Sequence, residues 1–211
     1  MIIEAFSDTH GNRHQNLKFK GADVLICAGD ISNYGEYKAV TKFLDWLKKL
    51  DGYKHKILIP GNHDLSFEDR PDWLLKELKK LPKNIHYLEH SGIEINKIKF
   101  YGCPTTPIFG DWAFMSNDKE RVSIYNNIPK DTDVLITHGP PFGILDVNRF
   151  GENCGCGYIE EFTKDVKVHI FGHIHEGYGF KEKDNKRYYN VSSFKVFNDS
   201  SIVNDPVIIE I

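Results

Sequence analysis

The chain contains 211 residues, of which 40% are hydrophobic and 27% are charged, and its formal net charge is −3. These proportions are typical of a soluble globular protein and give no reason to expect a nucleic-acid polymer or an anionic membrane as the main partner. No apolar stretch approaches the ~20 residues of a membrane span. The N-terminus lacks the basic region of a signal peptide, and four cysteines are too few for a disulfide scaffold, so we expect a reduced, cytoplasmic protein.

Short apolar runs alternate with amphipathic stretches early in the chain and dominate its second half. Apolar residues between 37 and 47 recur at three- and four-residue steps, which predicts a helix, whereas the short β-rich runs predict strands. We expect strands at 2–6, 24–28, 56–59, 85–88, 93–95, 98–101, 134–136, 168–171 and 207–211, a hairpin of 177–180 with 187–191, and helices at 34–50, 71–81, 119–126 and 158–165. A loop rich in proline, glycine and aromatic residues is expected at 103–117. This order predicts an α/β fold of two packed mixed sheets with helices outside, and we take 1–211 as one domain.

Polar side chains follow five of the apolar runs, in each case beside a glycine or within one residue of it. Because sites in α/β sheets form at the carboxyl ends of strands, we expect these segments to converge. An extended backbone beyond the run at 168–171 would point His173 and His175 in the same direction. The candidate ligands from the five segments are Asp8 and His10, then Asp30, then Asn62 and His63, then His138, and finally His173 and His175.

The types of these side chains narrow the choice of metal. Imidazole, carboxylate and amide oxygen without thiolate suit Mn²⁺ first, with Fe²⁺, Zn²⁺ or Ni²⁺ as alternatives, and argue against Ca²⁺ or Mg²⁺ alone. The candidate ligands are too many for one tetrahedral ion, but they suffice for two divalent ions that share a carboxylate and hold a water or hydroxide between them. The sequence therefore predicts a two-metal site.

The strand-end motifs together resemble those of the calcineurin-like metallophosphoesterases. They read Asp8-Thr9-His10, Gly29-Asp30, Gly61-Asn62-His63-Asp64, Thr137-His138-Gly139 and Gly172-His173-Ile174-His175, in that order. The resemblance implies a four-layer α/β/β/α sandwich, the metallo-dependent phosphatase fold. It also implies that Asp8, His10 and His175 hold one metal, that Asn62, His138 and His173 hold the other, and that Asp30 bridges them. His63 would not be a ligand and would stabilise the phosphoryl oxygens or protonate the leaving oxygen.

Further segments resemble the branch of metallophosphoesterase-domain proteins that includes cyclic nucleotide phosphodiesterases. They begin at Tyr101 (Y-G-C-P-T-T-P), Thr137 (T-H-G-P-P), Gly155 (G-C-G) and Phe171 (F-G-H-I-H-E-G-Y-G). We therefore expect hydrolysis of a small-molecule phosphodiester, with cyclic nucleotides among the candidates, by in-line attack of a metal-bridging hydroxide, with His63 and Asp30 as catalytic residues. The alternatives are a small-molecule phosphomonoesterase and a non-catalytic metal-binding scaffold. A protein phosphatase of this superfamily is disfavoured, because Gly29-Asp30 is followed by Ile31-Ser32-Asn33 and not by the expected Asp-Arg pair.

For the other polar and aromatic residues, structural roles stand beside functional ones. Asp64 either orients a neighbouring group or caps its turn, and His169 is expected to pack within its strand or to contact a metal ligand, in preference to binding metal itself. The loop aromatics Phe109, Trp112 and Phe114 either stack a nucleobase or pack against the core. The remaining candidates are four histidines expected on the surface, namely His14, His55, His86 and His90, and two loop cysteines with no assigned chemistry, Cys154 and Cys156. The sequence leaves the physiological ester and the oligomeric state open.

Overall fold

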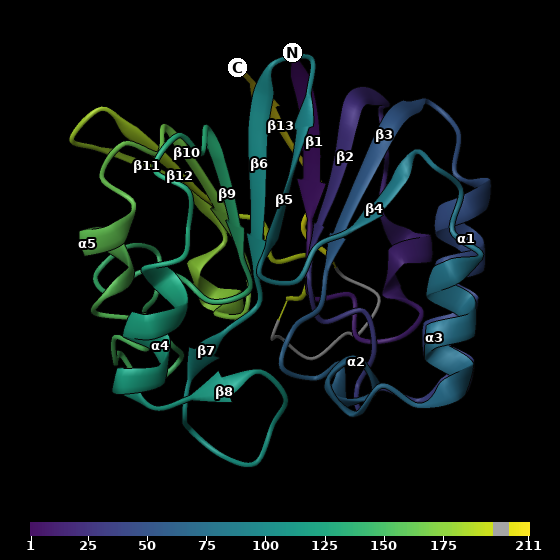
Figure 1. Ribbon diagram of the computed structural model, residues 1–211, viewed down its shortest axis with the longest axis horizontal. Helices are drawn as coiled ribbons and strands as arrows, with labels where there is room; N and C mark the ends of the chain where they lie inside the picture. Colours follow the sequence, from purple (N-terminus) through teal and green to yellow (C-terminus); the bar gives the residue numbers. More distant parts are fainter. Residues whose placement is uncertain (196–202) are drawn as a thin grey trace.

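Two β-sheets face each other in the computed structural model, which describes residues 1–195 and 203–211 (Figure 1). The strand order of the first sheet is β13-β1-β2-β3-β4. Strands β1 to β4 are parallel, and β13 runs antiparallel to β1. The bounds are β1 (Ile2–Phe6), β2 (Ala22–Ala28), β3 (Tyr53–Ile59), β4 (Ile85–Tyr87) and β13 (Val207–Glu210).

The second sheet has the strand order β11-β12-β10-β9-β6-β5. Strands β12, β10, β9 and β6 are parallel, and the edge strands β11 and β5 run antiparallel to their neighbours. The bounds are β5 (Ser91–Ile95), β6 (Ile98–Cys103), β9 (Val134–Thr137), β10 (Val168–Phe171), β11 (Gly179–Lys183) and β12 (Lys186–Asn190). Both sheets are therefore mixed, as the sequence predicts.

The main core lies between the two sheets, where alternate residues of the strands point inward. Ile26 and Ile57 from the first sheet share one buried cluster with Phe100, Val134 and Ile170 from the second. This alternation follows from the period of two along a strand, which places every second side chain on the same face.

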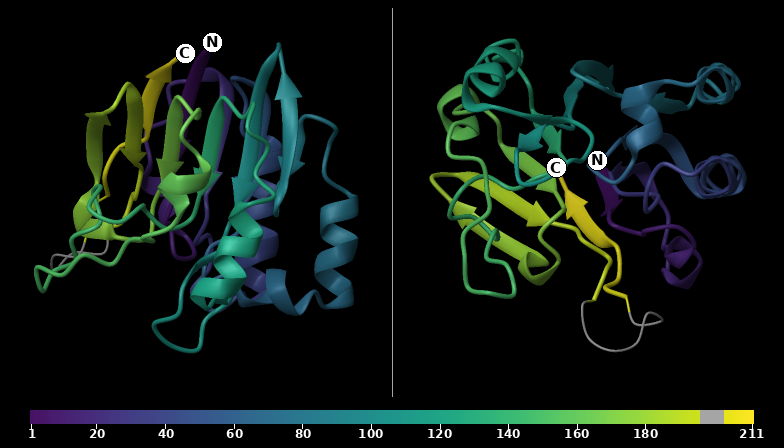
Figure 2. Two further views of the ribbon diagram at one scale, coloured as in Figure 1. Left: turned by 60° about the vertical axis from the view of Figure 1, so that its left-hand side comes forward. Right: turned by 90° about the horizontal axis from the view of Figure 1, so that it is seen from below.

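Helices cover the outer face of each sheet (Figures 1 and 2). On the first sheet lie α1 (Tyr37–Lys49) and α3 (Asp72–Lys79), with α2 (Leu65–Asp69) below the carboxyl ends of its strands, and on the second sheet lie α4 (Asp118–Tyr125) and α5 (Ile159–Phe162). Helix α1 buries Val40, Phe43, Leu44 and Leu47, the stripe predicted by their spacing, and each such side chain stabilises the fold by about 1.5–3 kcal/mol. The predicted four-layer α/β/β/α sandwich is confirmed.

Several element bounds differ from the expected ones. Helix α1 begins at Tyr37 and not at residue 34, because Gly35 has a φ of 69° and Glu36 is extended. Helix α5 ends at Phe162, three residues before the expected end. Helix α2 was not expected, and the predicted loop at 103–117 contains the short parallel strands β7 (Thr106–Pro107) and β8 (Met115–Ser116).

The hairpin of β11 and β12 is longer than expected and turns at Asp184 and Asn185. Both residues have positive φ values, of 53° and 62°, which suit the two-residue turn of a twisted hairpin. Two 3-10 turns complete the fold, η1 (Arg13–Asn16) and η2 (His175–Gly177). Of the helices that the structure describes, none has the length and apolar character needed to cross a membrane.

Candidate metal centre

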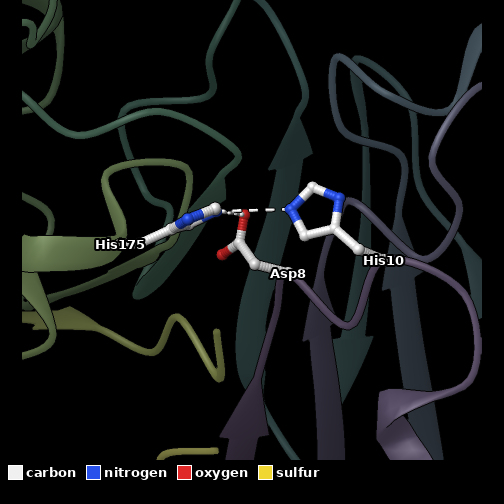
Figure 3. A group of neighbouring side chains, drawn as sticks. All are labelled: Asp8, His10 and His175. Carbon is white, nitrogen blue, oxygen red and sulfur yellow. Dashed lines mark hydrogen bonds and ion pairs between the residues drawn. The ribbon is translucent and has the colours of Figure 1, made fainter. Parts of the chain in front are cut away.

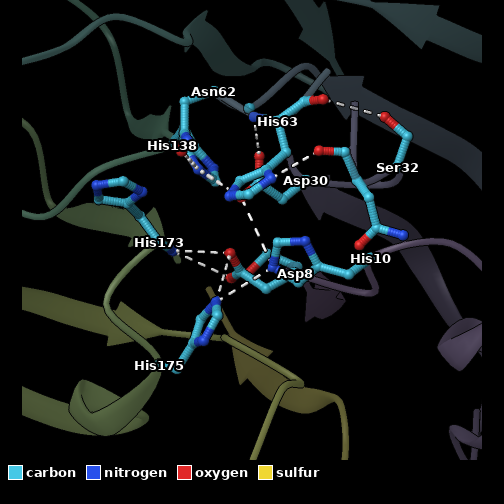
Figure 4. Close-up of polar contacts among 12 residues, drawn as sticks. Asp8, His10, Asp30, Ser32, Asn62, His63, His138, His173 and His175 are labelled. Carbon is cyan, nitrogen blue, oxygen red and sulfur yellow. Dashed lines mark hydrogen bonds and ion pairs between the residues drawn. The ribbon is translucent and has the colours of Figure 1, made fainter. Parts of the chain in front are cut away.

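The predicted ligands meet at the carboxyl ends of β1, β2, β3, β9 and β10 (Figures 1 and 4). The chain termini lie at the opposite end of the sheets, where Met1 N donates to the Ile211 carbonyl over 2.6 Å. Because the parallel strands of both sheets end on the same side, segments far apart in sequence converge there, as is usual for ligand sites in α/β folds. The structure brings together all of the candidate ligands.

The first group of ligand atoms comes from Asp8, His10 and His175, and the three atoms lie within 4.8 Å of one another (Figure 3). His175 Nε2 is 3.5 Å from Asp8 Oδ1, and the Nε2 atoms of His10 and His175 are 3.3 Å apart. The Asp8 carboxylate is completely buried. These three residues are the ones that the resemblance assigns to one metal.

The second group comes from Asp30, His138 and His173, whose ligand atoms also lie within 4.8 Å of one another (Figure 4). His138 Nε2 is 2.9 Å from Asn62 Oδ1 and 3.3 Å from Asp30 Oδ2. Asp30 Oδ2 is also 3.8 Å from His10 Nε2, so the Asp30 carboxylate lies between the two groups.

Hydrogen bonds to backbone carbonyls orient the imidazole rings. His138 Nδ1 donates to the Ala28 carbonyl over 2.9 Å, which leaves Nε2 facing Asp30 and Asn62. His63 Nδ1 donates to the Asn33 carbonyl over 2.8 Å. Such contacts fix the tautomer and raise the basicity of the other ring nitrogen.

Four residues of the site have left-handed backbone conformations, which are uncommon outside glycine. Asp8, His10, Asp30 and His173 have positive φ values of 55°, 41°, 56° and 70°. Non-glycine residues in this region cost about 1–3 kcal/mol each and concentrate at functional sites.

The expectation that His173 and His175 point in the same direction was wrong. The backbone of His173 is in the left-handed region, and its N–H donates to the Asp8 carboxylate. His175, in contrast, begins the turn η2. The two imidazoles therefore diverge, and His173 joins Asp30 and His138 while His175 joins Asp8 and His10.

The glycines of the motifs are required by close packing. A Cβ on Gly61 would lie 2.2 Å from Asp30 Oδ1, and one on Gly172 would lie 2.3 Å from Asp8 Oδ2. Each distance is far below van der Waals contact, so neither position accepts a side chain without displacing a candidate ligand.

Burial and the neighbouring charges shift the pKa values of the carboxyl and imidazole groups in the cluster. Burial alone would raise the pKa of the Asp8 and Asp30 carboxyl groups, but the facing imidazoles, His175 for Asp8 and His138 for Asp30, hold both pKa values well below the usual range. For His138, burial opposes protonation, yet the Asp30 carboxylate raises the pKa of the ring to about 9. Burial lowers the pKa of His10 to about 4 and of His173 to about 3.

These residues fit a divalent metal centre. Asp8 and Asp30 are buried carboxylates, and among the described residues their only ion-pair partners are histidines. Buried charges are normally paired or coordinate metals, and neutral imidazoles with carboxylates are the ligands that first-row divalent metals prefer.

His63 lies at the edge of the cluster and forms a third group of possible ligand atoms with His10 and Asp30, within 4.8 Å of one another. Its backbone N–H donates to Asp30 Oδ1 over 2.8 Å, and its half-buried ring lies 4.7 Å from the ring of His10 and 4.1 Å from that of Trp112. The ring is thus close enough to the ligands to contact a substrate held by them.

Asp64 joins the two loops that carry Asp30 and Asn62. Its buried carboxylate accepts from the backbone N–H groups of Gly61, Ile31 and Ser32 and from the Ser32 hydroxyl. Burial and the neighbouring Asp30 raise the pKa of Asp64 to about 6. Asp64 fits both roles considered from the sequence, since it binds the Gly61 N–H within its own turn and orients the neighbouring loop through the N–H groups of Ile31 and Ser32.

The histidines outside the site include one wrong assignment. His14 is buried, with its Nδ1 donating to the Gly11 carbonyl over 3.0 Å and its ring against Phe43 and Trp46. Sequence reasoning missed this contact because the turn η1 that carries His14 has no periodic pattern. His90 is exposed and His169 is buried, as expected. His55 and His86 are half-buried, and His55 Nδ1 lies 3.2 Å from His86 Nε2.

Of the two roles expected for the loop aromatics, core packing is confirmed for Phe114, whereas nucleobase stacking by Phe109 or Trp112 stays a prediction. Phe114 is buried and packs in the core beneath α1, whereas Trp112 stacks with Tyr34 at a centroid distance of 5.7 Å and also contacts His63. Phe109 is 58% exposed, with its ring 5.3 Å from that of His173. Cys154 faces a cleft of about 630 Å³ beside the ligands, while Cys156 is buried.

The fold and the ligand cluster together define an α/β/β/α protein with a candidate metal site at the carboxyl ends of its strands. Residues 1–177 match the family model described as calcineurin-like phosphoesterase. The chain belongs to this family.

Relatives across animals share most of the chain. The human metallophosphoesterase domain-containing protein 1 is 33% identical over 229 residues, which span 97% of this chain and 69% of the human protein. A UPF0046 protein of Caenorhabditis elegans is 33% identical over 232 residues, which span 96% of this chain and 58% of that protein.

Solved structures agree on the fold. The phosphopantetheinyl hydrolase of Mycobacterium tuberculosis aligns with a TM-score of 0.61 and 19% identity, covering 90% of this chain and 88% of that one. A protein of Thermus thermophilus aligns with a TM-score of 0.64 and 14% identity over the same shares. At these identities the likeness shows the fold alone.

Proposed function

We propose that this chain hydrolyses small-molecule phosphodiesters at a centre of two divalent metal ions. In this proposal Asp8, His10 and His175 hold one ion, Asn62, His138 and His173 hold the other, and Asp30 binds both. The observation that carries it is the position of Asp30, whose Oδ2 faces His10 Nε2 at 3.8 Å and His138 Nε2 at 3.3 Å. A carboxylate between two ligand groups is what a pair of ions needs.

The residues around the ligands supply orientation and proton transfer. Two divalent ions, Mn²⁺ as our first choice and Fe²⁺, Zn²⁺ or Ni²⁺ as alternatives, would supply charge stabilisation and a nucleophile at neutral pH. The Ala28 and Asn33 carbonyls hold the rings of His138 and His63 in one tautomer each. His63, with Nδ1 bound to Asn33, presents Nε2 as the group that stabilises the phosphoryl oxygens or, when protonated, donates a proton to the leaving oxygen.

Two clefts that border the ligands support a diester over a monoester. The larger, of about 630 Å³, is bordered by Asp30, His63 and His175. A second cleft of about 350 Å³ borders His10, with Asn33 among its lining residues. A diester carries two ester groups, and each cleft has room for one of them.

We also propose that residues 1–211 form a single domain in a reducing compartment such as the cytoplasm. The strands after the matched residues complete both sheets, since β12 pairs with β10 and β13 pairs with β1. The four cysteines are free.

Turnover of paired substrates tests the function. The metal-free protein is reconstituted with Mn²⁺, its metal content is measured, and hydrolysis of bis(p-nitrophenyl) phosphate is compared with that of p-nitrophenyl phosphate. Hydrolysis of 2′,3′- and 3′,5′-cyclic nucleotides is then measured under the same conditions. We expect two metals per chain and faster turnover of the diester.

Each other result has a definite meaning. Turnover of the monoester alone would replace the proposal with a small-molecule phosphomonoesterase. Two bound metals without turnover of any ester would instead favour a non-catalytic metal-binding scaffold.

A further inference from the structure

The larger cleft has one apolar wall, made by the loop after β6 and by the loop after β9. Pro107, Ile108, Phe109 and Phe142 line this side. Phe109 and Phe142 are 58% and 59% exposed, so their rings face the cleft and solvent and are not packed into the core. Aromatic faces of this kind attract both apolar groups and cations.

The polar wall of the same cleft presents oxygen atoms. Asn148, Glu152 and Asn153 line it. The Asn153 amide nitrogen donates to Asp146 Oδ1 over 2.6 Å, and the Asn148 amide nitrogen donates to Glu152 Oε2 over 3.2 Å. The Asn148 amide uses both of its N–H groups within the loop, on Glu152 Oε2 and Cys154 Sγ, while the Asn153 amide keeps one N–H for a ligand. The Glu152 carboxylate and the Asn153 carbonyl oxygen are acceptors of this wall.

The Asp146 carboxylate holds this wall in shape. Asp146 is buried and accepts from the backbone N–H groups of Gly143 and Gly155 over 2.9 Å and 3.0 Å. The loop that carries Glu152 is therefore fixed from within before any ligand binds, which reduces the entropic cost of binding.

No lysine or arginine lines the cleft in the parts of the chain that the structure describes. Two cations on neighbouring segments make contacts of their own: the Arg149 guanidinium lies 4.7 Å from the Phe150 ring, and Lys181 Nζ donates to the Gly143 carbonyl. Burial raises the pKa of the Cys154 thiol in this wall, and the carboxylates of Glu152, Asp146 and Glu176 act in the same direction. Among the described residues that line the cleft, Glu152 is thus the charged side chain outside the candidate metal ligands and His63.

We propose that this cleft binds an ester group that carries an ammonium ion, so that the substrate is a phosphate ester of an amino or quaternary ammonium alcohol. Phe109 and Phe142 contact the alkyl groups and the cation, and Glu152 supplies the opposite charge. The proposal rests on the proposed function in placing the phosphate of this ester at the metal ligands. It goes beyond that function by naming the chemistry of the alcohol.

Competitive inhibition of bis(p-nitrophenyl) phosphate hydrolysis by three matched monoesters tests the preference. Phosphocholine carries the cation, 3,3-dimethylbutyl phosphate is its neutral isostere, and 3-phosphonooxypropanoate is anionic. We expect phosphocholine to inhibit about tenfold more tightly than the neutral isostere, and the anionic ester to be the weakest. Equal inhibition constants for the first two esters, or tighter binding of the anionic one, would overturn the proposal.

Two variants distinguish a local effect of Glu152 on cation binding from an effect of the protein's overall charge. Glu152→Gln is expected to bring the inhibition constants of phosphocholine and its isostere within about twofold of each other. Glu94→Gln makes the same change of charge at residue 94 of β5, which pairs with Lys99 near the start of β6, and is expected to keep the wild-type ratio. A ratio that survives in Glu152→Gln contradicts the assignment.

Binding of free choline to the metal-free protein, followed by saturation-transfer NMR, tests the cleft without catalysis. A signal in the wild type that is lost in Glu152→Gln supports the proposal, and no signal in the wild type overturns it. If the metal-loaded enzyme hydrolyses no ester, the proposed function fails, while the choline result still decides the chemistry of the cleft.

Discussion

His63 Nδ1 donates a hydrogen bond to the backbone carbonyl of Asn33 over 2.8 Å, so the loop after β2 orients a side chain that follows β3. The His63 backbone N–H meanwhile binds Asp30 Oδ1. The ring of His63 therefore contacts Asn33 while its backbone contacts Asp30, and substitution of the side chain should leave the backbone contact in place.

His63→Ala is expected to retain both metals and to lower kcat by about 10²–10⁴-fold, the usual contribution of a general acid. Metal content by elemental analysis and kcat on bis(p-nitrophenyl) phosphate check this. His55→Ala, at a half-buried position early in β3, is the matched control and should retain wild-type kcat. Loss of metal from His63→Ala would show that His63 is a ligand.

Asp30→Ala is expected to weaken metal binding by more than about 100-fold and to abolish turnover, because its carboxylate faces both ligand groups. Titration of the metal-free protein with Mn²⁺ measures this directly. Asp23→Ala alters a carboxylate at the other end of β2 and should leave the titration unchanged. If Asp30→Ala bound two metals as tightly as the wild type, Asp30 would not be shared between them.

Gly172→Ala should destabilise the fold by about 3 kcal/mol or more, since the added Cβ would lie 2.0 Å from Ser7 Oγ and 2.3 Å from Asp8 Oδ2. Urea denaturation gives the free energy of unfolding. Gly157→Ala is the control, because no atom lies within 4 Å of its added Cβ, and we expect a change within about 0.5 kcal/mol there. Equal stability of the two variants would contradict the packing at Gly172.

Thr137 joins a buried histidine to the turn after β9. Its hydroxyl accepts from His169 Nε2 over 2.8 Å and donates to the Gly139 carbonyl over 2.6 Å, while His169 Nδ1 has no partner among the described residues. Thr137→Val is expected to cost about 1–3 kcal/mol of unfolding free energy, because it leaves the His169 N–H unsatisfied. Thr137→Ser keeps the hydroxyl and should recover most of this loss, and an equal loss in both variants would rule out the hydrogen bonds as its cause.

The fold and the convergence of the ligands could be predicted because they depend on strand periodicity, which is local. A buried strand precedes each of four candidate ligands, namely Asp8, Asp30, Asn62 and His138. Parallel strands bring their carboxyl ends together independently of the loop conformations. The conformation of the loops could not be predicted in this way. The φ of 70° at His173 is set by the bond from its N–H to Asp8, a residue 165 positions away.

The burial of His14 was missed for a related reason. Its partners on α1, Phe43 and Trp46, were predicted as a helix, but nothing in the local sequence indicates that η1 packs against them. The roles of the site residues stay predictions, because cluster geometry alone does not distinguish a ligand from a proton donor.

The burial of His14 also makes stability depend on pH. Burial lowers the pKa of His14 from 6.5 to about 4, so the unfolded chain takes up a proton that the folded chain excludes. The stability tied to neutral His14 is therefore fully present above pH 6.5 and is lost as pH falls from 6.5 towards 4, by up to about 3 kcal/mol. His14→Phe keeps an aromatic ring against Phe43 and Trp46 but has no proton to take up. Its own cost, the lost bond to the Gly11 carbonyl, is independent of pH.

The measurement is the free energy of unfolding of the wild type and of His14→Phe between pH 4.5 and 8, both in chelator. The titrations of the candidate metal ligands are common to the two proteins and cancel in the difference. We expect this difference to be constant above pH 7 and to shift in favour of His14→Phe as pH falls below 6.5, because only the wild type must bury a group that protonates in the unfolded state. A difference that stays constant over the whole range would show that His14 keeps an ordinary pKa and is open to solvent.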